Sequence, residues 1–169
     1  EHRAEQLVRL PETAWCFTPL SGDPPVGELP ATCHGYMTFG CFNNFAKVTE
    51  DMLQLWARIL QQVPRSRLAV KNVALGSPSV VQRLQAFFAR HGIAADRLEL
   101  IPPQASMRAH LQCYDRMDLA LDTFPYHGTT TTCEALWMGV PVLTLAGDRH
   151  VSRVGVSLLT NADLPEFVT

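Results

Sequence analysis

Strand-like and helix-like segments alternate along most of this chain, and this alternation constrains the fold more than any other feature. Short apolar or β-branched stretches occur at residues 35–42, 66–73, 97–102, 117–124 and 140–147. Between them, apolar residues recur at the spacing of amphipathic helices. A repeated β-α order is satisfied most economically by a parallel sheet with right-handed crossovers. We therefore predict an α/β fold, a Rossmann-like doubly wound parallel sheet.

Typical capping residues mark where the intervening helices begin. Thr49 and Ser106 are expected N-caps, and Ser77 precedes Pro78, which suits the first helical position. The expected helices cover about residues 49–63, 77–91, 106–114, 130–138 and 152–159.

The first 34 residues differ in character from the rest. The stretch “LSGDPPVGELP” is rich in proline and glycine and has no periodicity. We expect residues 1–34 to form an extended lead-in or inter-lobe connection, and residues 35–169 to form the Rossmann-like domain. The opening “EHRAEQLVRLPE” does not read as a signal peptide and looks like the interior of a longer protein.

Charge, hydropathy and cysteine spacing exclude several classes of protein. Lysine plus arginine number 14 against 16 aspartate plus glutamate, and no basic stretch indicates a nucleic-acid partner. No apolar run approaches the ~20 residues of a membrane span, so we expect no membrane partner. The five cysteines include no C-x-x-C pair. They predict reduced thiols in a cytoplasmic protein rather than a disulfide framework or a zinc site.

In doubly wound sheets, ligands bind beyond the carboxyl ends of the strands. Three segments of unusual chemistry fall there: “CFNNFAK” at 41–47, “PPQASMRAH” at 102–110 and “YHGTTTTCE” at 126–134. In the last segment, Gly128 allows close approach of a ligand, and a helix beginning near Thr130 offers unpaired N–H groups to an anion. Thr129, Thr130 and Thr131 can add hydroxyl donors for a diphosphate. The alternative is that one threonine caps the helix and the others face solvent.

Lysine is scarce, since Lys47 and Lys71 are the only two in the chain. Lys47 shares its loop with Asn43 and Asn44, and as a compact point charge it could neutralise a leaving diphosphate. The alternative is a solvated loop lysine. Lys71, at the end of the second strand, is a weaker candidate that could simply pair with a carboxylate.

His110, His127 and Glu134 also fall near the predicted edge. The histidines are either packed or solvated residues or ligands, but their spacing with Asp122 matches no metal motif. Glu134 lies about one helical turn into its helix, where a carboxylate could accept both hydroxyls of a ribose. Its alternative role is a surface charge or a partner of the helix dipole. The sequence has no G-x-G-x-x-G, Walker or G-x-S-x-G motif, which disfavours the enzyme classes that use them.

Two long segments carry a specific resemblance: “YMTFGCFNNFAKVTEDMLQLWARILQQVP” and “LDTFPYHGTTTTCEALWMGVPVLTLAGDRHVSRVGVSLL”, with “RLELIPP” between them. From about Leu7 to its end, the chain resembles the carboxyl-terminal catalytic half of the O-GlcNAc transferase/SPINDLY glycosyltransferases, in their bacterial TPR-linked branch. The resemblance implies the nucleotide-sugar-binding lobe of a GT-B enzyme that is inverting and needs no metal or other cofactor. The implied donor is a UDP-sugar, usually UDP-GlcNAc, and the implied acceptor is a protein serine or threonine.

The resemblance also implies roles for individual residues. Lys47 contacts the diphosphate and is needed for catalysis, and Asn44 is the polar residue three positions before it. The turn supplies the diphosphate cradle, Glu134 holds the ribose, and a separate loop faces the uracil. The residues expected in the cradle are Gly128, Thr129, Thr130 and Thr131, and those expected near the uracil are Gln104, Ala105 and His110.

The chain departs from the family pattern in three respects. His127 and Thr129 stand where this branch usually has asparagine and glycine, and we count both among the expected nucleotide-sugar ligands. A lysine that eukaryotic members carry in the loop after the third strand corresponds to Met107 or Arg108. We expect the amino-terminal lobe and TPR region, partners that supply acceptor contacts and a candidate base, to lie outside this chain, and the lobe at residues 35–169 to be truncated at its C-terminus.

We expect this piece to bind UDP weakly and not to catalyse transfer alone. Two alternatives stay open: a related transferase that uses GDP-fucose or UDP-glucose, and a non-catalytic nucleotide-binding module.

Overall fold

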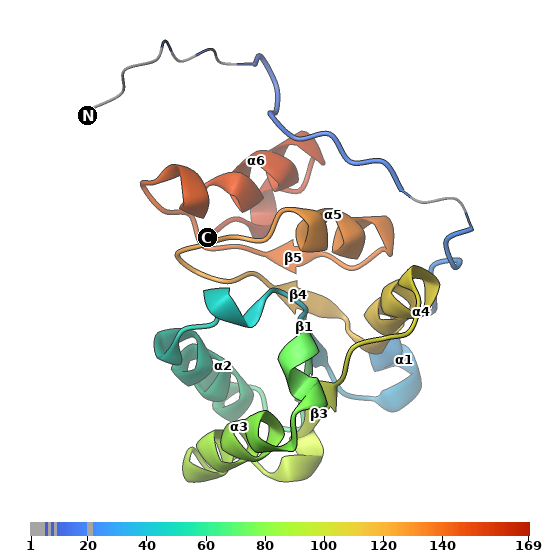
Figure 1. Ribbon diagram of the computed structural model, residues 1–169, viewed down its shortest axis with the longest axis vertical. Coiled ribbons are helices and arrows are strands. Elements are labelled where there is room, and N and C mark those ends of the chain that lie inside the picture. The colour runs from blue at the N-terminus through green and yellow to red at the C-terminus, as the bar shows by residue number, and fades with distance from the viewer. Residues whose placement is uncertain (1–5, 7, 9, 20–21) are drawn as a thin grey trace.

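The computed structural model describes residues 6, 8, 10–19 and 22–169. Its centre is a sheet of five parallel strands in the order β3-β2-β1-β4-β5 (Figure 1). The strands are β1 (Thr38–Cys41), β2 (Arg67–Lys71), β3 (Leu98–Ile101), β4 (Leu119–Leu121) and β5 (Val142–Leu143). This order confirms the predicted doubly wound α/β fold. It also places a topological switch point between β1 and β4, where such folds bind their ligands.

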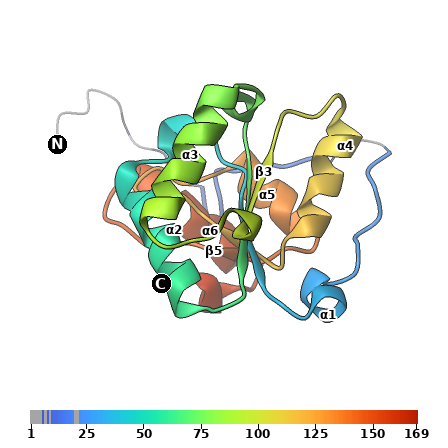
Figure 2. The same ribbon diagram turned by 90° about the horizontal axis from the view of Figure 1, so that it is seen from below.

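Helices cover both faces of the sheet (Figure 2). They are α1 (Pro30–His34), α2 (Glu50–Gln62), α3 (Pro78–Arg90), α4 (Met107–Gln112), α5 (Thr130–Trp137) and α6 (Val154–Asn161). Helices α2 and α3 pack on one face and α4 and α5 on the other. Along β1, Phe39 and Cys41 point to the first face, and Phe42, which follows, belongs to the second. This alternation is why the strand reads as continuously apolar.

The predicted helix caps are present, with one difference. The hydroxyl of Thr49 accepts a hydrogen bond from the N–H of Met52 at 3.3 Å, and α2 begins at the next residue. Ser106 caps α4 in the same way. Ser77 precedes α3 but makes no side-chain cap bond, and its hydroxyl lies 3.0 Å from that of Ser79 instead. The proline after Ser77 therefore helps to begin this helix through its restricted φ.

The segment before β1 is bonded to the residues just before β4 and to helix α5 on the second face. It ends in the short helix α1, and one carboxylate oxygen of Asp118 accepts the N–H of Ala31 at 2.7 Å. The other accepts the N–H of Thr38 at 2.7 Å. Farther upstream, the indole N–H of Trp137 donates to Asp23 at 2.9 Å. The described parts of the predicted lead-in thus run beside α6, α5 and α4 (Figure 1), and its residues 1–5, 7, 9, 20 and 21 lie outside the described residues.

In the part of the chain that the structure describes, no helix is both long and apolar enough to span a membrane.

Candidate functional site at the carboxyl edge of the sheet

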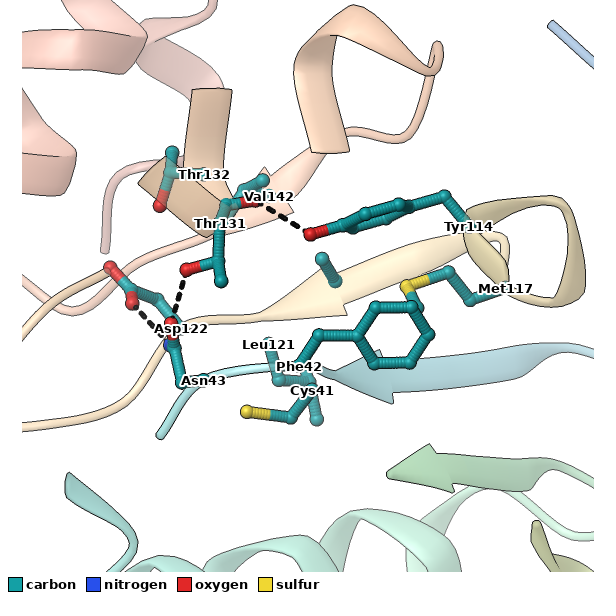
Figure 3. Close-up of a pocket in the computed structure, with 11 residues that line it drawn as sticks. Cys41, Phe42, Asn43, Tyr114, Met117, Leu121, Asp122, Thr131, Thr132 and Val142 are labelled. Atoms are coloured by element: carbon teal, nitrogen blue, oxygen red, sulfur yellow. Dashed lines mark hydrogen bonds between the residues drawn. The ribbon is translucent and has the colours of Figure 1, made fainter. Parts of the chain in front are cut away.

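Asn43 and Asp122 join the ends of β1 and β4 at the switch point (Figure 3). Asn43 is only 5% exposed, and its amide nitrogen donates to Oδ1 of Asp122 at 3.1 Å and to the hydroxyl of Thr123 at 3.0 Å. Its side-chain oxygen accepts a hydrogen bond from the hydroxyl of Thr131 at the start of α5. The buried amide of Asn43 therefore connects the end of β1, the end of β4 and the start of α5, although β1 is far from the other two in the sequence.

The carboxylate of Asp122 organises the loop that follows β4. Its Oδ1 accepts the N–H of Gly128 at 2.7 Å, and its Oδ2 accepts the hydroxyl of Thr144 at 2.8 Å. A Cβ on Gly128 would lie 2.6 Å from Oδ1 of Asn43 and 2.6 Å from Oγ1 of Thr131. Only glycine fits this close packing, so the turn before α5 depends on Gly128 for steric reasons.

Lys47 lies beside this turn, as predicted. It ends the short 3₁₀ helix η1 (Phe45–Lys47), and its Nζ donates to the backbone carbonyl of His127 at 2.7 Å. The same ammonium lies 4.1 Å from the centre of the Tyr126 ring, a cation–π contact. Partial burial lowers the pKa of Lys47, and the negative charge of Asp122 opposes this shift. The positive charge is therefore held next to the amino end of α5.

Two of the four threonines at 129–132 are buried or hydrogen-bonded within the protein, and in the described part of the chain the other two keep free hydroxyls. Helix α5 begins at Thr130, as expected, and Thr129 occupies the N-cap position without making a side-chain cap bond. Thr132 is 3% exposed, and the hydroxyl of Thr131 is engaged by Asn43. Among the described residues, the hydroxyls of Thr129 and Thr130 make no side-chain hydrogen bond. These two hydroxyls, together with the unpaired N–H groups of the first turn, are the donors left for an anion.

The ring of His127 faces the interior and cannot meet a ligand at this edge. It is 0% exposed, its Nδ1 accepts the N–H of Gly155 at 3.0 Å, and its Nε2 lies 3.0 Å from the carbonyl of Leu145. A carbonyl is an acceptor, so Nε2 carries the proton and donates. The expected ligand role therefore does not fit this side chain, because both ring nitrogens tie the turn to β5 and α6. Only the backbone of His127 takes part in the site, through Lys47.

A second cluster lies beyond the turn, between α4 and α5. Glu134 is 6% exposed, and its Oε2 accepts the hydroxyl of Tyr114 at 2.9 Å and lies 2.8 Å from Nε2 of His110. Nδ1 of His110 contacts Nζ of Lys71 at the end of β2. The hydroxyl of Tyr114 also lies 3.3 Å from the carbonyl of Thr131, which links the cluster to the turn (Figure 3). The structure thus brings together His110 and Glu134, two of the predicted residues.

A cavity of about 330 Å³ opens beside Glu134. Thr130 and Trp137 of α5 and Met107 of α4 form part of its wall. The lead-in supplies the opposite side, through residues 16–19 and Asp23. Glu134 therefore borders a space of small-ligand size, although most of its side chain is buried.

Three other predicted residues lie at the same edge, but their side chains make no hydrogen bond to these clusters. Asn44 is exposed, and its side chain accepts the N–H of Ala46 at 3.0 Å, so it caps η1. Gln104 and Ala105 are exposed in the loop between β3 and α4, where the amide of Gln104 donates to the carbonyl of Pro102 at 2.8 Å. Within residues 6, 8, 10–19 and 22–169, no three His, Cys, Asp or Glu side chains form a group that could hold a metal ion.

The site includes polar residues that the sequence did not single out as ligands or supports: Asn43, Asp122 and Tyr114. Asp122 was considered only with the two histidines as a metal motif, which their spacing disfavours, and Asn43 was noted only as a loop neighbour of Lys47. A buried polar residue directly after an apolar strand is the signal that could have found them, because such a group must be hydrogen-bonded.

The fold and the site together define a class. A parallel doubly wound sheet with a lysine beside the start of a helix, and a carboxylate one turn further on, is the arrangement of a GT-B glycosyltransferase lobe. The sequence agrees: residues 29–169 match the family described as glycosyl transferase family 41. The chain belongs to this family, and it corresponds to the carboxyl-terminal catalytic lobe of the O-GlcNAc transferase/SPINDLY proteins.

Relatives and solved structures support this assignment. The chain is 48% identical over 168 residues to a Petunia hybrida protein named probable UDP-N-acetylglucosamine–peptide N-acetylglucosaminyltransferase SPINDLY. It superposes on a mutant O-GlcNAc transferase of Thermobaculum terrenum with a TM-score of 0.78 and 43% identity over 87% of this chain and 28% of that one. Anabaena HepE, solved with UDP and glucose, shares the fold with a TM-score of 0.52 at 17% identity, over 77% of this chain and 34% of that one.

The alignment with the Petunia relative covers 99% of this chain and 18% of that protein. The chain therefore spans less than a fifth of the length of this curated relative.

Proposed function

We propose that this chain is the nucleotide-sugar-binding lobe of an inverting, metal-independent glycosyltransferase. The full-length enzyme transfers GlcNAc from UDP-GlcNAc to serine or threonine hydroxyls of proteins. Membership of glycosyl transferase family 41 supports the reaction class. The name of the Petunia relative supports the donor and a peptide acceptor. An amino-terminal lobe and a TPR region of the full-length protein are the expected partners that supply acceptor contacts, and the bacterial TPR-linked placement stays a prediction.

One observation carries the proposal: Nζ of Lys47 lies 2.7 Å from the carbonyl of His127, immediately before Gly128 and the start of α5. This contact joins residues 80 positions apart. It places a positive charge beside unpaired backbone N–H groups and the accessible hydroxyls of Thr129 and Thr130. Such an arrangement suits a diphosphate, because each element contributes donors or positive charge to phosphate oxygens.

The proposed chemistry follows from where charge develops. A serine or threonine hydroxyl displaces UDP at the anomeric carbon, so negative charge grows on the leaving diphosphate. Preorganised donors at that position stabilise the transition state more than the ground state. Lys47 is the proposed catalytic residue because its ammonium would touch the diphosphate. In this proposal, Glu134 accepts the ribose hydroxyls, and the loop at Gln104 and Ala105 faces the uracil.

Turnover of Lys47→Ala in the full-length enzyme tests the catalytic role. We expect kcat to fall roughly a hundredfold or more, as when one oxyanion donor is removed. Arg58→Ala is a matched control, because Arg58 is an exposed cation on α2. It should leave turnover unchanged. Near-normal turnover of the Lys47 variant would remove this residue from the mechanism.

Calorimetric titration of the full-length protein with UDP, GDP and UMP tests the donor class. A preference for UDP that chelator does not change supports a metal-independent UDP-sugar enzyme. A preference for GDP supports the fucosyltransferase alternative. Failure to bind any nucleotide would overturn the proposed function. Equal affinity for UDP and UMP would contradict the diphosphate cradle.

A cytoplasmic location is part of the same proposal. All five cysteines are free thiols in the structure. This agrees with a reducing compartment, where disulfides rarely persist. The location itself stays a prediction.

A further inference from the structure

Lys71, His110 and Glu134 form a chain of hydrogen bonds whose direction is set by chemistry. The ammonium of Lys71 contacts Nδ1 of His110, and an ammonium can only donate, so Nδ1 is the acceptor. The proton of the neutral ring therefore sits on Nε2. That nitrogen lies 2.8 Å from Oε2 of Glu134 and donates to the carboxylate. Lys71 thus determines which tautomer of His110 faces Glu134.

Tyr114 completes the arrangement from the other side. Its hydroxyl donates to the same Oε2 of Glu134 at 2.9 Å. Burial, reinforced by the charge of Glu134, raises the pKa of Tyr114 well above its ordinary value, so the phenol keeps its proton. Both protein donors thus converge on Oε2. Among the described residues, no hydrogen bond reaches Oε1, while Glu134 lines the 330 Å³ cavity.

Lys71 lies in a partly buried position, where a positive charge is unfavourable unless a nearby anion stabilises it. Its Nζ lies 5.6 Å from the centre of the Phe42 ring, and partial burial lowers its pKa. The negative charge of Glu134 and any ionisation of Cys113 oppose this shift. Burial raises the pKa of Cys113, so that thiol is neutral near pH 7 and supplies no counter-ion. Glu134 is therefore the anion that stabilises the charge of Lys71, through the His110 ring between them.

We propose that Lys71 is a positioning residue that acts through His110 to hold Glu134 with one carboxylate oxygen free for the paired hydroxyls of a nucleoside ribose. The inference rests on the proposed nucleotide-sugar function and deepens it. On this proposal, Lys71 at the end of β2 determines how strongly the protein prefers ribose to dideoxyribose, without itself touching the nucleotide. Without Lys71, Nδ1 of His110 can take the proton, and Nε2 then presents a lone pair to the carboxylate.

The test is the ratio of affinities of the full-length protein for UDP and for 2′,3′-dideoxyuridine 5′-diphosphate. For the wild type we expect UDP to bind at least about tenfold tighter, since a hydrogen bond to a charged group is lost with the hydroxyls. Lys71→Met should weaken UDP binding about tenfold, leave the dideoxy affinity nearly unchanged, and bring the ratio close to one. Lys71→Arg, which keeps a charged donor, should restore most of the ratio.

Two controls separate this role from general disruption. Arg67 begins the same strand at the far edge of the sheet, where it stacks on Tyr36 at 4.4 Å. Arg67→Met should keep the wild-type ratio. Lys47→Ala should weaken both nucleotides equally, because both carry the diphosphate. Thermal unfolding of each variant checks that it folds, and Lys71→Ala, which also lacks the ammonium donor, replaces Lys71→Met if the latter does not.

Each outcome decides the proposal. A wild-type ratio in Lys71→Met, or an equal loss of affinity for both nucleotides, would overturn the positioning role while leaving the proposed function intact. A wild-type protein that binds neither nucleotide would overturn the proposed function, and this inference with it.

Discussion

The side-chain amide of Asn43 donates to the carboxylate of Asp122 across 3.1 Å, and this bond joins the ends of β1 and β4 where the sheet reverses its strand order. Asp122 in turn accepts the N–H of Gly128 at 2.7 Å. The pair therefore supports the turn that begins α5. It does so from the interior, so its effect on ligand binding is separate from direct contact with a ligand.

Replacement of Asn43 by alanine should destabilise the domain much more than replacement of Asn44. Asn43→Ala removes bonds to Asp122, Thr123 and Thr131 from a buried site and leaves polar partners unsatisfied, which should cost about 3 kcal/mol. Asn44→Ala removes one exposed cap bond and should cost about 1 kcal/mol. Urea unfolding of the two variants measures both losses. Similar losses would show that Asn43 does not hold the site together.

A methyl group on Gly128 should disrupt nucleotide binding. In Gly128→Ala the new carbon would lie 2.6 Å from atoms of both Asn43 and Thr131, so the turn has to move. We expect UDP affinity to fall at least roughly tenfold, because the donors at the start of α5 lose their alignment. Gly76→Ala is the control, since its new carbon would come no closer than 3.7 Å to Pro103. Titration calorimetry compares them, and unaltered affinity in Gly128→Ala would argue against the cradle.

The affinity for UDP should decline in alkali at a pH below the ordinary lysine pKa of 10.5. The binding form of Lys47 is its ammonium, and burial lowers the pKa of that group. Deprotonation of the free protein therefore begins at lower pH than for an exposed lysine. Lys47→Arg keeps its charge across this range and should lose less affinity.

Ionisation of the uracil ring affects both proteins equally, so the difference between their pH profiles isolates Lys47. Superimposable profiles would contradict the assigned role.

Trp56 should be a main contributor to stability through its packing rather than its polar atom. It is 1% exposed in the core between the sheet and helices α2 and α3, and in the described chain its indole N–H has no hydrogen-bond partner. Trp56→Ala should reduce the free energy of unfolding by about 3–5 kcal/mol. Trp56→Phe keeps most of the apolar volume and removes the unpaired N–H, so it should cost less than about 1.5 kcal/mol. If denaturant unfolding showed equal losses of stability for Trp56→Ala and Trp56→Phe, packing would not be the main contribution of Trp56.

The thiols should differ sharply in reactivity. Burial raises the pKa of Cys41 to about 12 and also raises that of Cys113. At pH 8, which is below these values, both are protonated and unreactive. Cys16 and Cys33 are exposed. Iodoacetamide should therefore label these two at least roughly a hundredfold faster in the folded protein. Mass spectrometry after timed quenching measures the rates, and denaturant should abolish the difference.

Much of the fold could be predicted from local pattern. Helix α2 begins directly after Thr49, whose hydroxyl caps it, because capping and helical spacing depend on neighbouring residues. The absent cap bond of Ser77 shows the limit of this reasoning. Residue type indicates that a serine can cap, but the rotamer and its neighbour Ser79 decide whether it does.

For the candidate site, the sequence predicted the place of some residues correctly and of others wrongly. Lys47 was predicted correctly beside the Gly128 turn, from its place in the loop after β1 and from the family resemblance. Asn43 and Asn44 are neighbours of the same type, and the expectation fell on Asn44, whereas the fold buries Asn43 at the centre of the network. His127 has the composition of a ligand, but its ring packs inward between β5 and α6.

By itself, the sequence determined the order of strands and helices, the sheet edge where polar residues gather, and the family. These depend on periodicity, caps and motifs, which are properties of short stretches. Only the tertiary structure decided which polar groups meet. The contacts of His110 with Lys71 and Glu134 cross 39 and 24 residues of chain. The physical reason is that such contacts form only when separate elements pack at a particular angle and register, and no local pattern encodes that geometry.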